Sequence, residues 1–287
     1  MYRLLFLSFV LFLFSCEVEG VKKQSLNDDN LELENELESR TDKEEMDNSS
    51  LQQLKDDFLA LDNGITITWK KKGEGSKIKQ NDMVLIDYVS ALEDGKIYDG
   101  NHLIKKKAIP FFVGWNLQTP GWDIALKELR VGDDVEIFIP SELDRGEKGI
   151  PGVVPPNSNS IVSLKVLEML EPNENVDGIK IWRVEEKKNI TERIDFEDEV
   201  MIHYWASSAS KARYDNSYKR GEPFRLVMGD GNIVPGLYKA LHFAKEGDKL
   251  MIYIPAEQAY GEKGFQDLVK PNEDLFYDVL VYEVNKN

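Results

Sequence analysis

The stretch Arg145–Asn157, RGEKGIPGVVPPN, returns 115 residues further on as Tyr260–Asn272, YGEKGFQDLVKPN. Both copies contain Gly-Glu-Lys-Gly followed by Pro-Asn at the same spacing. Self-similarity at a fixed offset is the sequence signature of a repeated structural unit. The chain is therefore predicted to contain one domain twice.

Matches outside this stretch keep the same offset to within one residue. They are Gly64–Ile67 with Gly178–Ile181, Asp87-Tyr88 with His203-Tyr204, Tyr98-Asp99 with Tyr214-Asp215, Pro120-Gly121 with Pro235-Gly236, and Ile139-Pro140 with Ile254-Pro255. A chain of 287 residues has room for two domains of typical size. We expect the first domain over residues 64–171 and the second over 178–287, joined by the polar linker Pro172–Asp177.

Each copy has the same predicted anatomy of several strands and one short helix. Apolar runs indicate strands at Met83–Ser90, Val135–Ile139, Ile161–Leu170, Val200–Trp205, Leu250–Ile254 and Leu275–Val281. After each Pro-Gly pair, apolar residues at helical spacing predict a helix that ends before a glycine, Gly132 in the first copy and Gly247 in the second. Many strands with one helix on one face of a sheet indicate an α+β fold.

The N-terminus precedes the repeat and differs from it in composition. Residues 1–15 hold one cation and an apolar run of about 11 residues, which is shorter than the roughly 20 residues of a membrane-spanning helix. They indicate an export signal, and Leu13–Cys16 resembles the lipobox of a bacterial lipoprotein. We expect Cys16, the single cysteine, to be lipidated after cleavage; the alternative is an ordinary signal peptide with an incidental cysteine.

Residues 16–50 are rich in acidic side chains and contain no aromatic residue. Such a segment cannot bury enough apolar surface to offset its ordering entropy, so we predict a disordered tether between membrane and folded domains. A binding role for the acidic run is the alternative. The apolar spacing of Leu51, Leu54, Phe58 and Leu61 then predicts a short helix over residues 51–63.

The composition excludes several classes of function. Lys and Arg number 36 against 52 Asp and Glu, a net charge of −16, which argues against nucleic acid as the partner because phosphate binding needs clustered cations. One cysteine excludes intramolecular disulfides and cysteine-cluster metal sites, and three scattered histidines offer no paired metal ligands. We therefore expect no metal and no other cofactor.

The ordered motifs of each copy resemble the FKBP-type peptidyl-prolyl cis-trans isomerase family. In both copies Tyr-Asp is followed by Pro-Gly, Ile-Pro, Gly-Glu-Lys-Gly and Pro-Asn, so the resemblance covers both predicted domains. It implies two tandem FKBP-like domains, each a twisted antiparallel half-barrel sheet around one short helix. It also implies catalysis of rotation about X–Pro bonds, whose barrier arises from amide resonance. An apolar aromatic cup favours the less polar, twisted transition state without a nucleophile, metal or nucleotide.

By this resemblance, the second copy has the better-preserved pocket. The residues it implies as catalytic are Tyr214, Asp215, Val234 through its backbone N–H, and Tyr260 through its phenol. The residues it implies as substrate-binding are Tyr204, Phe224, Ile233, Leu237, Val269 and Tyr277. Leu237 departs from the family pattern, which places a tryptophan at the pocket floor, and the smaller floor is expected to weaken affinity.

The first copy keeps a tryptophan floor but departs from the pattern elsewhere. Its counterparts of the pocket residues are Tyr88, Tyr98, Asp99, Ile109, Trp122, Arg145, Val154 and Val162. Ile109 and Val162 replace aromatic walls, and Gln118-Thr119 replaces an aliphatic pair. Arg145 brings a fixed charge to the place of the donor tyrosine, at a cost in desolvation. We expect this first pocket to be weak or inactive.

Two functions stay open at this point. One is a peptidyl-prolyl isomerase that is held at a bacterial membrane by lipidated Cys16 and acts on proline-containing exported polypeptides, mainly through its second domain. The other is a non-catalytic FKBP-like binding or chaperone lipoprotein. Both place the protein in the bacterial cell envelope, and a monomer is the simplest expectation.

Overall fold

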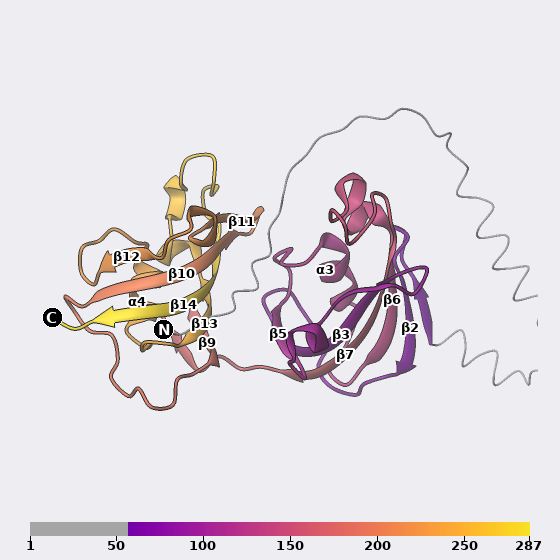
Figure 1. Cartoon of the computed structure of the whole chain (residues 1–287), viewed down its shortest axis with the longest axis horizontal. Coiled ribbons are helices and arrows are strands. Elements are labelled where there is room, and N and C mark those ends of the chain that lie inside the picture. The colour runs from indigo at the N-terminus through magenta and orange to yellow at the C-terminus, as the bar shows by residue number, and fades with distance from the viewer. Residues whose placement is uncertain (1–56) are drawn as a thin grey trace, which may run out of the picture.

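The computed structural model describes residues 57–287. These residues form two domains of the same design, each an antiparallel sheet that curls around one short helix (Figure 1). The predicted signal over residues 1–15, Cys16 and the predicted tether over residues 16–50 lie outside the described residues. The predicted α+β fold is confirmed in both repeats.

The two domains use the same strand order. The first contains β1 (Phe58–Ala60), β2 (Thr66–Lys71), β3 (Met83–Leu92), β4 (Ile97–Gly100), β5 (Ile109–Phe112), α3 (Pro120–Leu126), β6 (Asp134–Ile139) and β7 (Ser160–Met169). The second contains β8 (Glu174–Val176), β9 (Ile179–Glu185), β10 (Glu199–Ser208), β11 (Lys211–Asn216), β12 (Phe224–Val227), α4 (Pro235–Leu241), β13 (Lys249–Ile254) and β14 (Leu275–Asn285). The first sheet runs β1-β2-β6-β7-β3-β4 with β5 beside β3, and the second runs β8-β9-β13-β14-β10-β11 with β12 beside β10.

Two segments differ from the sequence prediction, and the difference is the same in both repeats. The described part of the predicted helix over residues 51–63 contains strand β1, and the predicted linker contains strand β8. Both strands add to the outer edge of their sheet, where β1 pairs with β2 and β8 with β9. Leu59 packs on the first core while its neighbours Phe58 and Ala60 face solvent, which is the two-residue period of a strand. Each repeat therefore begins earlier than its sequence motifs indicate.

The Pro-Gly pair positions the helix against the sheet in each domain. Proline fills the first helical position, where its missing N–H costs no hydrogen bond. The glycine that follows lies so close to the sheet that an added Cβ would meet Ile139 Cγ2 at Gly121, or Ile254 Cγ2 at Gly236, at 2.3 Å. Each helix thereby presses its apolar face onto the concave side of its sheet, where the functional site forms.

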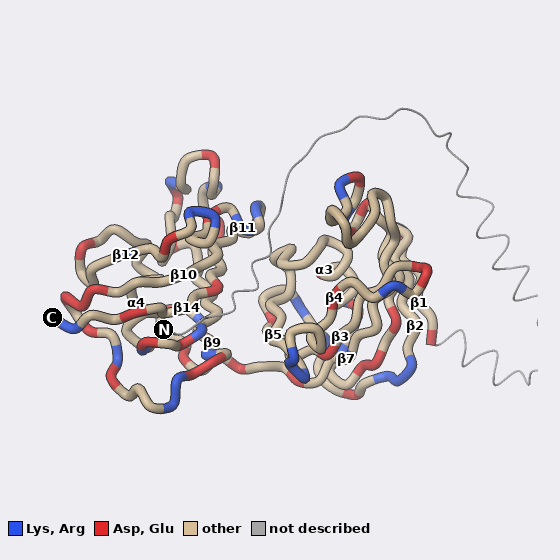
Figure 2. The backbone as a smooth tube through the Cα atoms, in the orientation of Figure 1, with Lys and Arg blue, Asp and Glu red and all other residues tan. Residues whose placement is uncertain are grey.

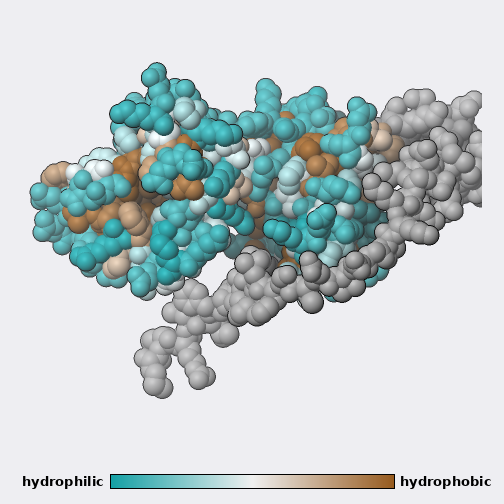
Figure 3. Space-filling view, turned by 90° about the horizontal axis from the view of Figure 1, so that it is seen from above, coloured by the Kyte–Doolittle hydropathy of each residue, from teal (hydrophilic) through white to brown (hydrophobic). Residues whose placement is uncertain are grey.

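A third apolar cluster joins the two domains. Met83, Phe112 and Trp115 of the first domain pack there against the outer face of the second sheet, at Trp182, Met251 and Phe276. Phe112 is fully buried, and its ring stacks on Phe276 with centroids 4.5 Å apart. The indole Nε1 of Trp182 donates to the carbonyl oxygen of Leu170 at 2.8 Å. Apolar residues also reach the molecular surface at the junction of the domains (Figure 3).

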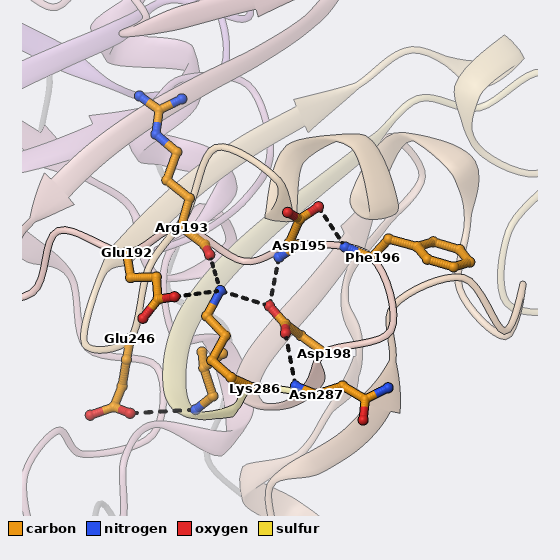
Figure 4. Close-up of polar contacts among 9 residues, drawn as sticks. Glu192, Arg193, Asp195, Phe196, Asp198, Glu246, Lys286 and Asn287 are labelled. Atoms are coloured by element: carbon orange, nitrogen blue, oxygen red, sulfur yellow. Dashed lines mark hydrogen bonds and ion pairs between the residues drawn. The ribbon is translucent and has the colours of Figure 1, made fainter.

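The C-terminus is held on the second domain by a polar network (Figure 4). The ammonium of Lys286 lies 2.9 Å from Asp198 Oδ2, and it also donates to the backbone carbonyl of Arg193. Asp198 accepts from the backbone N–H of Asp195 as well. Burial raises the pKa of Asp198, but these donors outweigh it and lower that pKa. The network fastens the long connection before β10 to the end of β14.

Charges of both signs are interspersed along both domains (Figure 2). Within residues 57–287, no helix is long and apolar enough to cross a membrane. The same residues contain no group of three or more His, Cys, Asp or Glu side chains that could hold a metal ion.

Candidate functional site

The second domain gathers its predicted pocket residues around the N-terminus of α4. Tyr204 comes from β10, Tyr214 and Asp215 from β11, Phe224 from β12 and Tyr277 from β14. The remaining residues come from the helix and the loops beside it, namely Ile233, Val234, Leu237, Tyr260 and Val269. The nine apolar and aromatic members belong to one cluster, and Asp215 joins it through Tyr204. The structure thus brings together the complete predicted set.

We call the predicted pocket residues of the second domain the second cup. Tyr204, Asp215 and Arg220 form a polar triad at one side of it. The Tyr204 hydroxyl donates to Asp215 Oδ2, and Arg220 donates to Asp215 Oδ1 at 2.6 Å and to the Tyr204 oxygen at 2.8 Å. Burial raises the pKa of Asp215, but the donors Tyr204 and Arg220 outweigh it and lower that pKa below its usual value. Burial and the adjacent carboxylate raise the pKa of Tyr204 to about 12. At neutral pH the triad therefore holds a carboxylate, a neutral phenol and a guanidinium.

Aromatic rings form the walls of the cup. Tyr204 lies edge-on to Phe224 at a centroid distance of 6.0 Å and tilted against Tyr277 at 5.9 Å. Tyr260 stacks on Phe265 at 4.8 Å, which orients its phenol. The hydroxyl oxygen of Tyr214 is buried next to the hydroxyls of Tyr260 and Tyr277. Burial raises the pKa values of Tyr214, Tyr260 and Tyr277, so all three phenols are neutral donors at physiological pH.

The helix supplies the floor and one backbone donor. Leu237 is buried on α4 and belongs to the core of the second domain, and its place at the floor stays a prediction. Val234 stands just before the helix in an extended conformation. Its carbonyl accepts from Leu237 and Tyr238. Among the described residues its backbone N–H has no acceptor, which leaves it available to a substrate carbonyl.

The first domain gathers the corresponding residues but fills its cup differently. The indole of Trp122 lies edge-on to Tyr88 at 5.0 Å and stacked on Phe111 at 5.7 Å. Val162 is buried in the same cluster and Ile109 is partly buried against it, whereas Val154 is buried but does not belong to that cluster. The first cup therefore has a large aromatic floor and small aliphatic walls, the reverse of the second.

A polar bridge involves three residues of the first cup. Arg145 donates to Gln118 Oε1 at 2.9 Å, and Gln118 Nε2 donates to Asp99 Oδ2 at 3.5 Å. The Tyr98 hydroxyl pairs with Ser160 Oγ at 2.8 Å. A substrate carbonyl entering this cup would have to displace existing hydrogen bonds. The weaker first pocket stays a prediction.

Sequence reasoning missed Arg220 and the bridging role of Gln118. Arg220 lies in a short 3₁₀ turn after β11, and the equivalent turn after β4 has Ile104 at that place, so comparing the repeats gives no sign of an arginine. Gln118 was noted only as a departure from an aliphatic pair. Its two hydrogen bonds depend on the loop geometry that sets Asp99 and Arg145 on either side of it.

The residues of these sites suit catalysis of rotation about an amide bond. An apolar aromatic cup removes water from a bound amide, and neutral donors at the rim hold the flanking carbonyls. Rotation about an X–Pro bond needs only this, because its transition state has lost amide resonance and is less polar than the ground state. The fold and the second cup define the class of proline-binding domains built on a curled antiparallel sheet.

The family comparison agrees with this class. The family model described as FKBP-type peptidyl-prolyl cis-trans isomerase matches residues 74–167 and again residues 191–282. The chain therefore belongs to that family and carries its domain twice.

Several known proteins are similar over both repeats. Peptidyl-prolyl cis-trans isomerase FKBP10 of Mus musculus is 28% identical over 206 residues, 72% of this chain and 35% of the relative. Peptidyl-prolyl cis-trans isomerase FKBP9 of Homo sapiens is 27% identical over 208 residues, 72% of this chain and 36% of the relative. The chain thus spans about a third of the length of these relatives. The crystal structure of the three FKBP domains of wheat FKBP73 aligns with a TM-score of 0.40 at 24% identity, covering 79% of this chain and 97% of that one.

Proposed function

We propose that the protein catalyses cis-trans isomerisation of X–Pro bonds and that its second domain is the main catalyst. The observation that supports the proposal is the second cup, where neutral phenols and an unpaired backbone N–H belong to one apolar cluster. Val234 and Tyr260 hold the carbonyls that flank the proline, and Tyr204, Phe224 and Tyr277 enclose its ring. Asp215 and Arg220 fix the orientation of Tyr204.

The experiment is an isomerisation assay on a series of X-Pro-Phe peptides with the full chain. Tyr260→Phe removes one donor and is expected to lower kcat/KM by about 2- to 12-fold, since a hydrogen bond contributes about 0.5–1.5 kcal/mol. Asp215→Ala should lower it as well. The matched controls are the same positions of the first domain, Arg145→Ala and Asp99→Ala, which should leave the rate nearly unchanged. No acceleration by the folded full chain on any peptide would refute the enzyme.

A non-catalytic binding or chaperone function is the second candidate, and the departures of the first cup from the family pattern at Ile109, Arg145 and Val162 favour it. In that case the first domain binds a client polypeptide, and the second domain catalyses isomerisation of its X–Pro bonds. Variants of the first domain would then change peptide affinity without changing kcat.

We further propose that the protein is a lipoprotein of the bacterial cell envelope that acts on proline-containing exported polypeptides. The support is sequence alone, the lipobox-like Leu13–Cys16 and the acidic segment that follows. Acyl chains on Cys16 would hold the domains at the membrane, because each buried CH₂ contributes about 0.8 kcal/mol. Cys16→Ser should abolish incorporation of labelled palmitate and release the protein from membranes, and Ser15→Ala should not. Labelling that survives Cys16→Ser would refute the anchor.

A further inference from the structure

A cleft lies between the two domains, beside the first cup. Its volume is about 170 Å³. The first domain lines it with Ile109, Pro110, Phe111, Leu117 and Gln118, and the second with Trp205, Ser207, Arg213, Met251, Phe276 and Asp278. Residues from both domains are therefore needed to make this cleft.

The cleft shares two residues with the predicted first cup. Ile109 is both a wall of the cup and a wall of the cleft. Gln118 lines the cleft and is hydrogen-bonded to Asp99 and Arg145 of the cup. A polypeptide whose proline sits over Trp122 would therefore continue directly into the cleft.

The second domain also positions the rim of the first cup. The Arg213 guanidinium donates to the carbonyl oxygen of Leu117 at 2.9 Å, one residue before the Gln118-Thr119 pair. The same guanidinium lies 5.0 Å from the centroid of the Trp205 ring, and the backbone N–H of Arg213 donates to Ser207 Oγ at 2.9 Å. The strand pair β10–β11 thus reaches across the junction and holds this loop.

The outer face of the second sheet is adapted to this contact. Trp182, Met251, Asp278 and Trp205 follow one another on adjacent strands as a single row across that face. The corresponding row of the first sheet reads Thr68, Glu136, Ser163 and Val89. The apolar face is therefore a property of the second copy alone, and duplication of the fold does not explain it.

The size and lining of the cleft select its occupant. Ligand pockets for small molecules are typically about 300–1,000 Å³, whereas an apolar cavity of about 150 Å³ accepts a benzene ring. The walls are mainly apolar and include the indole of Trp205, while Ser207, Arg213 and Asp278 offer polar groups to a passing backbone. The carboxylate oxygen Oδ2 of Asp278 lies 3.7 Å from the ammonium nitrogen of Lys249. This ion pair offsets the negative charge that Asp278 brings to the cleft. One aromatic side chain of an extended polypeptide meets these conditions.

We propose that the cleft is a side-chain pocket for an aromatic residue of the client polypeptide, within one or two positions of the proline held by the first domain. The inference rests on the proposed function, since it needs the first cup to bind proline. It makes the first domain a site that selects client sequences with help from the second domain. The second cup has no such neighbour, because the counterpart of Leu117 is the exposed residue Asn232.

The test is photo-crosslinking of proline peptides to the full chain. Each peptide carries one p-benzoyl-phenylalanine at a different position around the proline, and mass spectrometry locates the crosslinks. We expect crosslinks at Met251 or Trp205 from one or two positions next to the proline. We also expect a phenylalanine at that position to improve binding by the first domain at least 10-fold over alanine.

Two variants and their controls examine the cleft itself. Leu117→Trp fills the cleft and Trp205→Ala removes one wall, and each should abolish the crosslinks and the preference for phenylalanine. The controls are Asn232→Trp, at the matched position of the second domain, and Tyr282→Ala, at an exposed aromatic residue of the second sheet, which should keep both. Isomerisation without cleft crosslinks, or with equal binding of the phenylalanine and alanine peptides, refutes this inference alone. Absence of both proline-peptide binding and isomerisation refutes the proposed function and the inference together.

Discussion

Phe112→Ala should separate the two domains without unfolding either of them. Phe112 is fully buried, but its ring neighbours are Trp115 of its own domain and Trp182, Tyr253 and Phe276 of the second. It belongs to the cluster between the domains and to neither domain core. Truncation of a buried phenylalanine costs about 3–5 kcal/mol. Nearly all of this cost should fall on docking of the domains.

The expected observation is a change in cooperativity. In the wild type the docked domains should unfold in one transition, because undocking would expose the aromatic cluster. Weakening the docking by about 3–5 kcal/mol should split thermal or urea unfolding into two transitions, one for each domain. Differential scanning calorimetry of the full chain measures this directly.

The control lies one residue further along the chain. Val113 is also fully buried, but it belongs to the core of the first domain. Val113→Ala should lower the stability of the first domain by about 0.5–3 kcal/mol and leave the domains coupled. A single transition in Phe112→Ala, or a split transition in Val113→Ala as well, would show that the cluster does not couple the domains.

Three further predictions concern the cups. Tyr98→Phe should lower the free energy of unfolding by about 0.5–1.5 kcal/mol because the hydrogen bond to Ser160 is lost, and urea unfolding of the variant beside the wild type measures this. Leu237→Ala should destabilise the second domain by about 2–5 kcal/mol, and an unchanged melting temperature would contradict its place in the core. The pKa of Asp215 is lower in the folded protein than in the unfolded chain, so the ionised carboxylate stabilises the fold. This stabilisation is complete above the ordinary carboxyl pKa of about 3.9, and it is lost as the pH falls through the lower pKa of the folded protein. Asp215→Asn should therefore flatten the acid side of the stability profile, and an identical profile in the variant would exclude this ion pair as its cause.

Much of the fold followed from the repeat and from apolar periodicity. The central strands such as β3 and β10 were predicted within a few residues, because their alternating side chains face a core on one side. The edge strands β1 and β8 were missed, because three-residue strands carry too little pattern to compete with a helical spacing or a polar linker. Their existence depends on pairing with β2 and β9, which is tertiary information.

The residues assigned to the second cup followed from family motifs, but Arg220, which pairs with Asp215 and Tyr204, did not. The junction of the domains could not be predicted. Outward-facing residues such as Trp182 and Met251 alternate correctly with core residues, and single exposed apolar side chains are common on protein surfaces. Only the folded arrangement shows that they form one continuous face that meets Phe112.

The aromatic cluster between the domains also affects how tightly the protein would bind a client that contains more than one proline. Two proline cups on a flexible linker would share a client at an effective concentration set by the linker, whereas docked domains hold the cups at a fixed separation. If both cups bind proline as proposed, a long client with two suitably spaced prolines gains avidity, because its second attachment costs no reorientation of the domains. A client with one proline gains nothing. The packed junction would then favour extended, unfolded chains over short loops of folded proteins.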